Sequence, residues 1–199
     1  MNKGVYVATA LSLGLVGMAQ TYSVQGSLGY FTGFGGNFSL MATGFDLPVG
    51  GRLGVTFAGT DLIDYGLYFP SIEAGEASNV TLNLDLLLPI PTSETGEVVV
   101  NPYVGLRYNF FAAQAKNYLT DLDISSNQFG MGAGALVEYP LSPEVGLFAD
   151  LGLDYFWDAA IEFGSEHYET SDPGYDEVRR FLNAPETTFK FLLGVRLAF

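Results

Sequence analysis

The sequence predicts an all-β fold, an eight-stranded antiparallel up-and-down barrel that spans a membrane. Three observations predict it. Apolar side chains recur at every second position in eight separate segments, which is the period of a β-strand with one apolar face. The connections between these segments alternate between short and long. After the first twenty residues there is no apolar run of the roughly 18 residues that a membrane-spanning helix requires.

The composition narrows the class of protein. Hydrophobic residues make up 48% of the 199-residue chain, aromatic residues make up 15%, and the formal net charge is -14. Only 8 lysine and arginine residues are present, which argues against a nucleic-acid partner because phosphate contacts need clustered cations. The apolar and aromatic content also argues against disorder. The chain has no cysteine, which excludes a disulfide and a thiolate site.

The first nineteen residues have the layout of a secretory signal peptide. A short positive start that contains Lys3 precedes an uncharged, mostly apolar run over 4–17, which is too short to span a bilayer as a helix. Gly17 and Ala19 then place small residues at the two positions that signal peptidase reads. We therefore expect cleavage after Ala19, leaving a single domain over 20–199.

The last strand shows the alternation most clearly. Large apolar residues stand at every second position from Phe189 to Phe199, and mixed residues, including Lys190 and Arg196, stand between them. The same reading applied along the chain gives eight strands. They are expected over 21–31, 37–47, 52–59, 78–88, 98–110, 128–139, 145–157 and 187–199.

The connections give the orientation in the membrane. The even-numbered strands are followed by short turns over 48–51, 89–97 and 140–144. The odd-numbered strands from the third on are followed by long, strongly acidic segments over 59–78, 111–127 and 158–186. Outer-membrane barrels have short periplasmic turns and longer outer loops, so we expect the long segments to lie outside the cell. The last long segment has room for a short hairpin above the membrane.

Aromatic residues gather at both ends of the strands, on the lipid-facing parity, as an interface belt requires. The outer-end set is Tyr30, Tyr108, Phe110, Tyr155, Trp157 and Phe189, and the inner-end set is Tyr22, Tyr139 and Phe199.

The second face of the strands distinguishes a membrane barrel from a soluble sandwich. That face is rich in small and amide residues, and its four positive and four negative charges sum to zero, which fits an enclosed polar core in which charges must be paired. The expected interior charge network consists of Arg52, Asp85, Arg107, Glu138, Asp150, Asp154, Lys190 and Arg196.

Two ion pairs follow from the expected strand order. Arg52 is expected to meet Asp85, and Asp154 is expected to meet Lys190. Glycines at alternate positions of the sixth strand, Gly130 to Gly134, are expected to leave room for Tyr103 and Phe148.

The C-terminal run Gly194-Val195-Arg196-Leu197-Ala198-Phe199 resembles the assembly signal of bacterial outer-membrane proteins. Gly194, Leu197 and Phe199 match that signal, whereas Leu192 stands where a polar residue is usual. The whole chain after residue 19 resembles the small eight-stranded barrels of the OmpA, OmpX and OmpW kind, and is similar to the small outer-membrane barrels of Thermus-group bacteria. The resemblance implies a bacterial outer-membrane location, contact with outer-membrane lipid and recognition by the barrel-assembly machinery.

Candidate chemistry is sparse. The single histidine, His167, lies in the last long segment among Ser165, Glu166, Glu169 and Ser171. A serine–histidine pair there would be the sign of a lipid-modifying enzyme, the least favoured function. We interpret His167 as an exposed polar residue and do not expect an enzyme or a cofactor. Asp121 and Asp123 are candidate oxygen ligands for Ca²⁺ or Mg²⁺, although no twelve-residue calcium loop is present. A solvated charged surface explains the same residues.

Two functions fit these observations. The first is a barrel with a closed, charge-paired interior and a structural or surface-interaction role, in which the outer loops meet an extracellular partner. The alternative is a narrow conduit or binder for small apolar molecules, which would need an apolar inner pocket. The paired charges favour the first, because they fill a narrow lumen.

Overall fold

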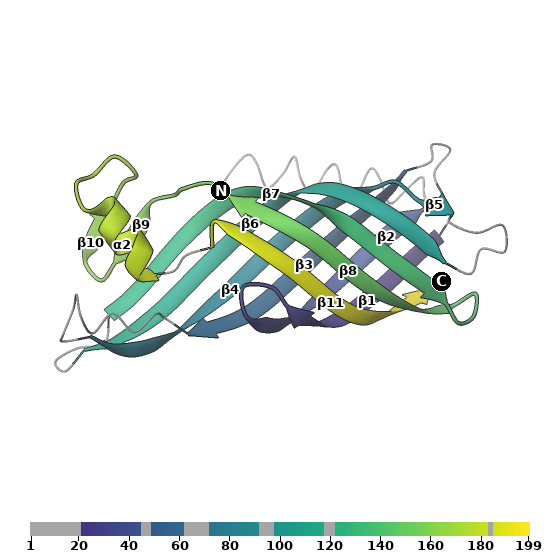
Figure 1. Ribbon diagram of the computed structural model, residues 1–199, viewed down its shortest axis with the longest axis horizontal. Helices are drawn as coiled ribbons and strands as arrows, with labels where there is room; N and C mark the ends of the chain where they lie inside the picture. The colour runs from purple at the N-terminus through teal and green to yellow at the C-terminus, as the bar shows by residue number, and fades with distance from the viewer. Residues whose placement is uncertain (1–20, 45–48, 62–71, 92–97, 118–121, 183–184) are drawn as a thin grey trace.

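The protein forms a closed antiparallel barrel of eight long strands, which confirms the predicted fold class (Figure 1). The computed structural model describes residues 21–44, 49–61, 72–91, 98–117, 122–182 and 185–199. Each long strand pairs with its neighbours in chain order, and the last pairs with the first to close the barrel. The strands are β1 (Thr21–Tyr30), β2 (Phe34–Thr43), β3 (Gly50–Asp61), β4 (Ile72–Leu87), β6 (Val99–Asn117), β7 (Leu122–Pro140), β8 (Val145–Phe156) and β11 (Thr187–Ala198).

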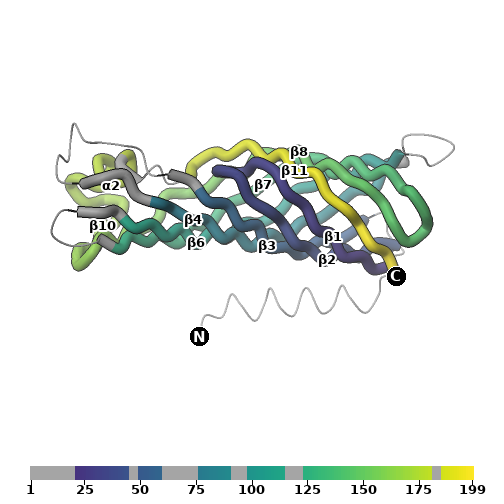
Figure 2. The backbone as a smooth tube through the Cα atoms, turned by 90° about the horizontal axis from the view of Figure 1, so that it is seen from below, coloured from purple at the N-terminus to yellow at the C-terminus, as the bar shows by residue number. Residues whose placement is uncertain are grey.

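Four short elements complete the described structure. At one end β5 (Ile90–Pro91) pairs with β6. At the other end β9 (Ile161–Phe163) and β10 (Glu166–Tyr168) form the short hairpin that the sequence allowed, and α2 (Tyr175–Leu182) follows. Among the described residues, no helix has the length and apolar character to cross a membrane. Figures 1 and 2 place this second end, the head end, opposite the turn end, where the chain finishes.

The second strand lies earlier than the sequence predicted. It begins at Phe34 rather than residue 37, because a tight connection closed by the Phe31 N–H donating to the Gly33 carbonyl (2.9 Å) already pairs Tyr30 with Phe34. Gly35 and Gly36 carry no side chain, so they interrupt the apolar period and conceal the start of the strand. The strand ends at Thr43, and residues 45–47 of the predicted range lie outside the described residues.

The central strands are much longer than predicted. The segments 59–78 and 111–127 were expected as loops, but β3 continues to Asp61, β4 begins at Ile72, β6 continues to Asn117 and β7 begins at Leu122. In the prediction from sequence, each strand ended where the outward apolar side chains stop. The strands instead continue past that point with a different polarity. The prediction therefore located the edge of the apolar belt, the band of outward apolar side chains around the barrel, and not the end of the strand.

The polarity of the wall inverts along these strands. In the middle of the barrel, the outward side chains are apolar and the inward ones polar: Leu106 is 62% exposed, whereas Arg107 is 1% exposed. Toward the head end, Phe111 is buried inside and Gln114 is exposed outside. A wall in lipid must be apolar outside, whereas a wall in water buries its apolar side chains inside. The inversion therefore marks where the barrel leaves the membrane.

The predicted lipid-facing directions are confirmed. Leu106, Leu151 and Val195 point outward and are exposed, and Leu84 and Val137 are partly exposed on the same parity. The aromatic residues gather at both edges of this belt. Tyr155 packs against Trp157 near the head end, with ring centroids 6.2 Å apart, and Tyr22 stacks on Phe199 at the turn end, with centroids 6.4 Å apart.

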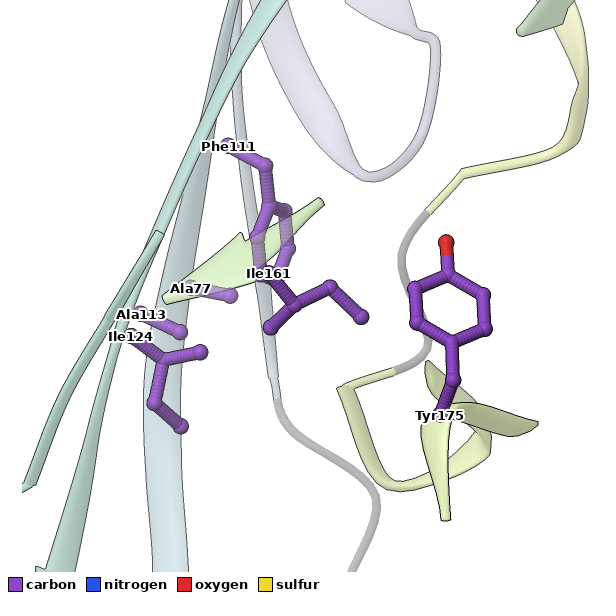
Figure 3. Packing of buried hydrophobic residues seen from close by; sticks show 6 residues of the cluster. All are labelled: Ala77, Phe111, Ala113, Ile124, Ile161 and Tyr175. Carbon is purple, nitrogen blue, oxygen red and sulfur yellow. The ribbon is translucent and has the colours of Figure 1, made fainter. Parts of the chain in front are cut away.

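A hydrophobic core closes the head end. We call this part of the barrel the outer head (the described residues of 72–79, 111–117, 122–127 and 157–182). Its buried side chains come from β4, β6 and β7 on one side and from β9 and α2 on the other (Figure 3). They are Ala77, Phe111, Ala113, Ile124, Ile161 and Tyr175. The hairpin is held there because β9 pairs with β7 and because the Tyr175 hydroxyl donates to the Ala159 carbonyl (2.8 Å). The described part of the segment 158–186 is thus a folded cap rather than an open loop.

Candidate functional site: the charged lumen

The inward positions of the barrel carry all eight of the predicted interior charges. Seven are buried, and Arg196 is partly exposed, with 17% of its side chain accessible. They face inward because strand alternation puts every second residue on the lumen side, and the registers place charges from different strands at similar heights.

Five of these charges form one alternating chain of ion pairs. Arg107 bonds Asp154 through Nε (2.7 Å) and Asp85 through Nη1 (2.6 Å). Asp85 in turn accepts from Arg52 Nη2 (2.7 Å), which confirms the pair predicted from the register. Arg52 Nη1 then reaches Asp150 (2.8 Å). Lys190 approaches the end of the chain at Asp150, so three cations and three anions are matched and burial leaves no net charge in this layer.

The chain of ion pairs crosses the lumen. Arg52 lies on β3 and Asp150 on β8, which stand on opposite walls because three strands separate them in either direction around the ring of eight. Removing charges from water is costly, and only short, hydrogen-bonded partners offset that cost. The opposing charges therefore hold the two walls together and fill the space between them.

Tyr103 supports this layer from β6. Its hydroxyl donates to Asp150 (2.7 Å), and its ring lies 4.7 Å from the Arg52 guanidinium carbon and 4.9 Å from Lys190 Nζ, measured to the ring centroid. A cation over an aromatic face gains electrostatic attraction. Gly134 and Gly152 make room, since a Cβ at either would overlap the Tyr103 hydroxyl. The prediction that inward glycines accommodate Tyr103 is confirmed, whereas Phe148 is accommodated by Gly194.

A second polar layer lies nearer the turn end. Glu138 lies 3.6 Å from Arg196 Nε and accepts hydrogen bonds from Asn101 (2.9 Å) and Gln25 (3.3 Å). A buried apolar cluster fills the lumen beside it. Its members are Met41, Leu87, Tyr103, Leu136 and Phe148.

An amide layer lies on the head side of the ion pairs. Asn109 donates to Asn79 (3.0 Å) and Gln128 (3.3 Å), and Asn83 donates to Thr56 (2.8 Å). All five side chains are buried. The described lumen therefore passes from an apolar cluster through ions and amides to the outer head, with each buried level occupied by side chains.

One predicted ion pair is wrong. Lys190 was expected to meet Asp154, but the register places Lys190 opposite Gly152 and Thr188 opposite Asp154. The stagger of the strands puts the ammonium between two aspartates of β8, where it lies 3.4 Å from Asp150. Asp154 instead bonds Arg107 from β6.

The histidine lies on the exposed hairpin of the outer head. Its Nδ1 is 2.6 Å from Glu162, and its Nε2 is 3.0 Å from Glu169. A serine nucleophile would need one ring nitrogen as its base, yet both face carboxylates. The carboxylates of Glu169 and then Glu162 accept hydrogen bonds from the ring, which raises the pKa of His167 above its ordinary value.

The remaining sequence candidates stay predictions. Asp121 lies outside the described residues, and Asp123 is exposed on β7, where it accepts a hydrogen bond from Gln114 (3.0 Å). In the part of the chain that the structure describes, no group of three or more metal-binding side chains is placed to hold an ion. The assembly-signal residues Leu197 and Phe199 point outward at the seam where β11 closes on β1. The signal peptide over 1–19 also lies outside the described residues.

Comparison with solved structures identifies the family. The chain matches the crystal structure of a major outer membrane protein from Thermus thermophilus with a TM-score of 0.79 and 33% sequence identity, over 90% of this chain and 99% of that chain. The chain belongs to this family of small eight-stranded outer-membrane β-barrel proteins. The ion pairs described above therefore lie in the lumen of an outer-membrane barrel, and the apolar belt faces bacterial outer-membrane lipid.

More distant small outer-membrane barrels share the fold alone. Neisserial surface protein A matches with a TM-score of 0.50 and 14% identity, over 90% of this chain and 96% of that chain. The attachment invasion locus protein Ail of Yersinia pestis, in complex with the heparin analogue sucrose octasulfate, matches with a TM-score of 0.52 and 11% identity, over 90% and 97%. Comparison with family models and with curated proteins found no match.

Proposed function

We propose that this outer-membrane barrel is sealed along its lumen and acts at the cell surface through its outer head, in a structural or surface-interaction role. The observation that carries the proposal is the ion pair between Arg52 and Asp150, which joins opposite walls. A conducting path would have to pass this pair, the amide layer and the apolar core of the head. Each is a packed level, and breaking a buried ion pair is costly.

A liposome-swelling assay tests the seal. Purified protein reconstituted into liposomes should swell in a small sugar no faster than protein-free liposomes. The double variant Arg52→Ser with Asp150→Ser removes the crossing pair without leaving a net charge. If this layer is the barrier, liposomes that contain the double variant should swell faster than those that contain the wild-type protein. Swelling by the wild-type protein would contradict the seal and favour the alternative, a narrow conduit.

The outer head supports the second half of the proposal. Its exposed side chains include Glu162, Glu166 and Glu169 on the hairpin and Asp176 and Glu177 on α2. Arg179 is engaged with Asp158 (2.7 Å) and Glu186 (3.2 Å). The surface offered to the medium is therefore acidic, and it would attract basic partners over a Debye length, about 10 Å at 0.1 M salt.

This charge distinguishes the proposal from the heparin analogue seen with Ail, because a polyanion would be repelled by an acidic head. Detergent-solubilised protein should bind a polylysine surface at low salt, release as salt rises, and not bind heparin. The variant Asp176→Asn with Glu177→Gln should weaken binding, whereas Glu144→Gln, in the exposed turn at the opposite end, should not. Heparin binding by the wild-type protein would overturn the assignment of a basic partner.

A further inference from the structure

Two segments of the chain fold over the head end of the lumen. One is the β1–β2 turn, residues 31–33, and the other is the rim segment, residues 185–186, which leads into β11. Phe31 of the turn is 2% exposed and belongs to one buried cluster with Phe156, at the end of β8. The Phe156 N–H in turn donates to the Glu186 carbonyl (2.7 Å). This apolar cluster therefore connects the two segments.

A chain of hydrogen bonds joins the two segments a second time. At one end the Asn79 amide donates to Thr32 Oγ1 (3.1 Å). At the other end the Gln128 amide donates to the Pro185 carbonyl (3.1 Å). Asn109 lies between them and donates to Asn79 Oδ1 (3.0 Å) and to Gln128 Oε1 (3.3 Å). The chain uses β4, β6 and β7 but neither β3 nor β8, so it spans the mouth of the lumen rather than following the wall.

Asn109 is the central residue of this chain. Its NH₂ group supplies two N–H donors, one for each neighbour, and its Oδ1 accepts from the Thr81 hydroxyl (2.9 Å). An amide whose oxygen already accepts a hydrogen bond is a stronger donor, because successive hydrogen bonds polarise one another. Asn79 and Gln128 are therefore better donors to their segments while Asn109 is bonded to both. Because one side chain makes both bonds, a displacement of either neighbour disturbs the bond to the other.

The rim segment also reaches the outer head. Arg179 of α2 contacts the Glu186 carboxylate (3.2 Å), next to the Pro185 carbonyl that Gln128 holds. Packed and hydrogen-bonded contacts of this kind carry energetic coupling between distant sites. The contacts described here run without a break from the helix of the outer head, through the amide layer, to the β1–β2 turn.

We infer that the β1–β2 turn and the rim segment form one coupled closure, in which Asn109 transmits the release of either segment to the other. Coupling between two sites is reciprocal, so loosening the turn loosens the rim segment by the same free energy as the reverse. The closure lies on the head side of the ion pairs, and its release leaves them in place. It is therefore independent of the seal and of the surface role proposed above.

Amide hydrogen exchange, followed by NMR on the whole ¹⁵N-labelled protein in detergent micelles, tests the coupling. The Phe31 N–H, which donates to the Gly33 carbonyl, reports on the turn, and the Phe156 N–H reports on the rim segment. Thr32→Val removes the acceptor in the turn and should speed exchange at Phe156 severalfold. Gln128→Met removes the donor to the rim segment and should speed exchange at Phe31 to a similar degree.

Asn83→Leu is the matched control, because Asn83 is a buried amide of the same layer that bonds Thr56 and not this chain. It should change exchange at neither reporter. Asn109→Ser shortens the central side chain, so in that background the remote effects should vanish while the local effects remain. Thr32 is half-buried in the turn, so Thr32→Val keeps the test informative if a variant within the lumen does not fold.

Faster exchange at the remote reporter in both directions supports the coupled closure. Faster exchange only at the reporter beside the substituted residue would overturn it, because the two segments would then be held independently. An equal effect of Asn83→Leu would overturn it as well, because the whole layer would then loosen without a specific route. Remote effects that persist in the Asn109→Ser background would overturn the role of Asn109 and assign the coupling to the apolar cluster.

Discussion

Replacing Arg107 by Met should be the most damaging change in the charged lumen. The Arg107 side chain is fully buried and holds two carboxylates, Asp154 at 2.7 Å and Asp85 at 2.6 Å. After the change Asp85 keeps its contact with Arg52, but Asp154 loses its hydrogen-bonded cation. Removing one partner of a buried pair costs about 3–5 kcal/mol, because the other charge stays buried and uncompensated. We therefore expect the free energy of unfolding to fall by about that amount.

The double-mutant cycle with Asp154→Asn measures the pair itself. Neutralising Asp154 in the Arg107→Met background removes the orphaned charge, so the double variant should lose less than the sum of the single losses, with a coupling of about 1–3 kcal/mol. The matched cycle of Lys190→Met with Asp154→Asn should show a smaller coupling, because Lys190 contacts Asp150 instead.

The assay is urea unfolding in lipid vesicles, followed by the emission of Trp157, the one tryptophan of the chain. Additive losses in the Arg107–Asp154 cycle would refute the reasoning, because two buried charges at 2.7 Å must interact. Equal coupling energies in the two cycles would show that the charges of this layer interact nonspecifically and not through the individual ion pairs described.

Three other changes test separate parts of the molecule. Gly134→Ala should destabilise the barrel by about 1–3 kcal/mol, because the new Cβ would lie 2.2 Å from the Leu151 carbonyl oxygen and 2.5 Å from the Tyr103 hydroxyl. Gly26→Ala, with nothing within 4 Å, should be tolerated in the same unfolding assay. The ion pairs of His167 should stabilise the hairpin fully at a pH below the ordinary histidine pKa of about 6.5, and this contribution should be lost as the pH rises through the raised pKa of the folded state. In an NMR titration of the single histidine, Glu169→Gln should lower that pKa. An unchanged pKa would contradict the contact between His167 and Glu169. Deleting Phe199 should reduce insertion in cells more than refolding into detergent, and equal losses in both assays would assign the residue to stability rather than to recognition.

The sequence predicted the membrane part of this barrel well because one strong rule operates there. In lipid, outward positions must be apolar and inward charges must be paired. The side-chain directions of Leu106 and Arg107 can therefore be predicted from the residue type alone. The pair of Arg52 and Asp85 followed from two adjacent antiparallel strands on which both residues stand near the turn end. Lys190 was assigned the wrong partner because a small shift in register separates Asp154 from Asp150, and composition carries no such information.

The outer head was missed for a related reason. Phe111 and Ile124 stand on the inward parity, so a rule that counts outward apolar residues ends the strands before them. The contacts that bring Ile161 and Tyr175 to those residues come from a segment more than thirty residues further along the chain, and no local period encodes them. Tyr103 was found in advance because the alternate glycines on the neighbouring strand already indicated a large inward side chain.

Strand length argues that the outer head has a purpose of its own. A tilted strand needs about 9–11 residues to cross the bilayer. The 10 residues of β1 and the 12 of β8 meet that requirement, whereas β6 and β7 have 19 residues each. The surplus is not loose, since it pairs in register, inverts its polarity and receives a hydrophobic cap. A barrel that only had to cross the membrane would gain nothing from these residues. The additional structure of this chain therefore lies at the head end, beyond the part of the lumen that holds the ion pairs.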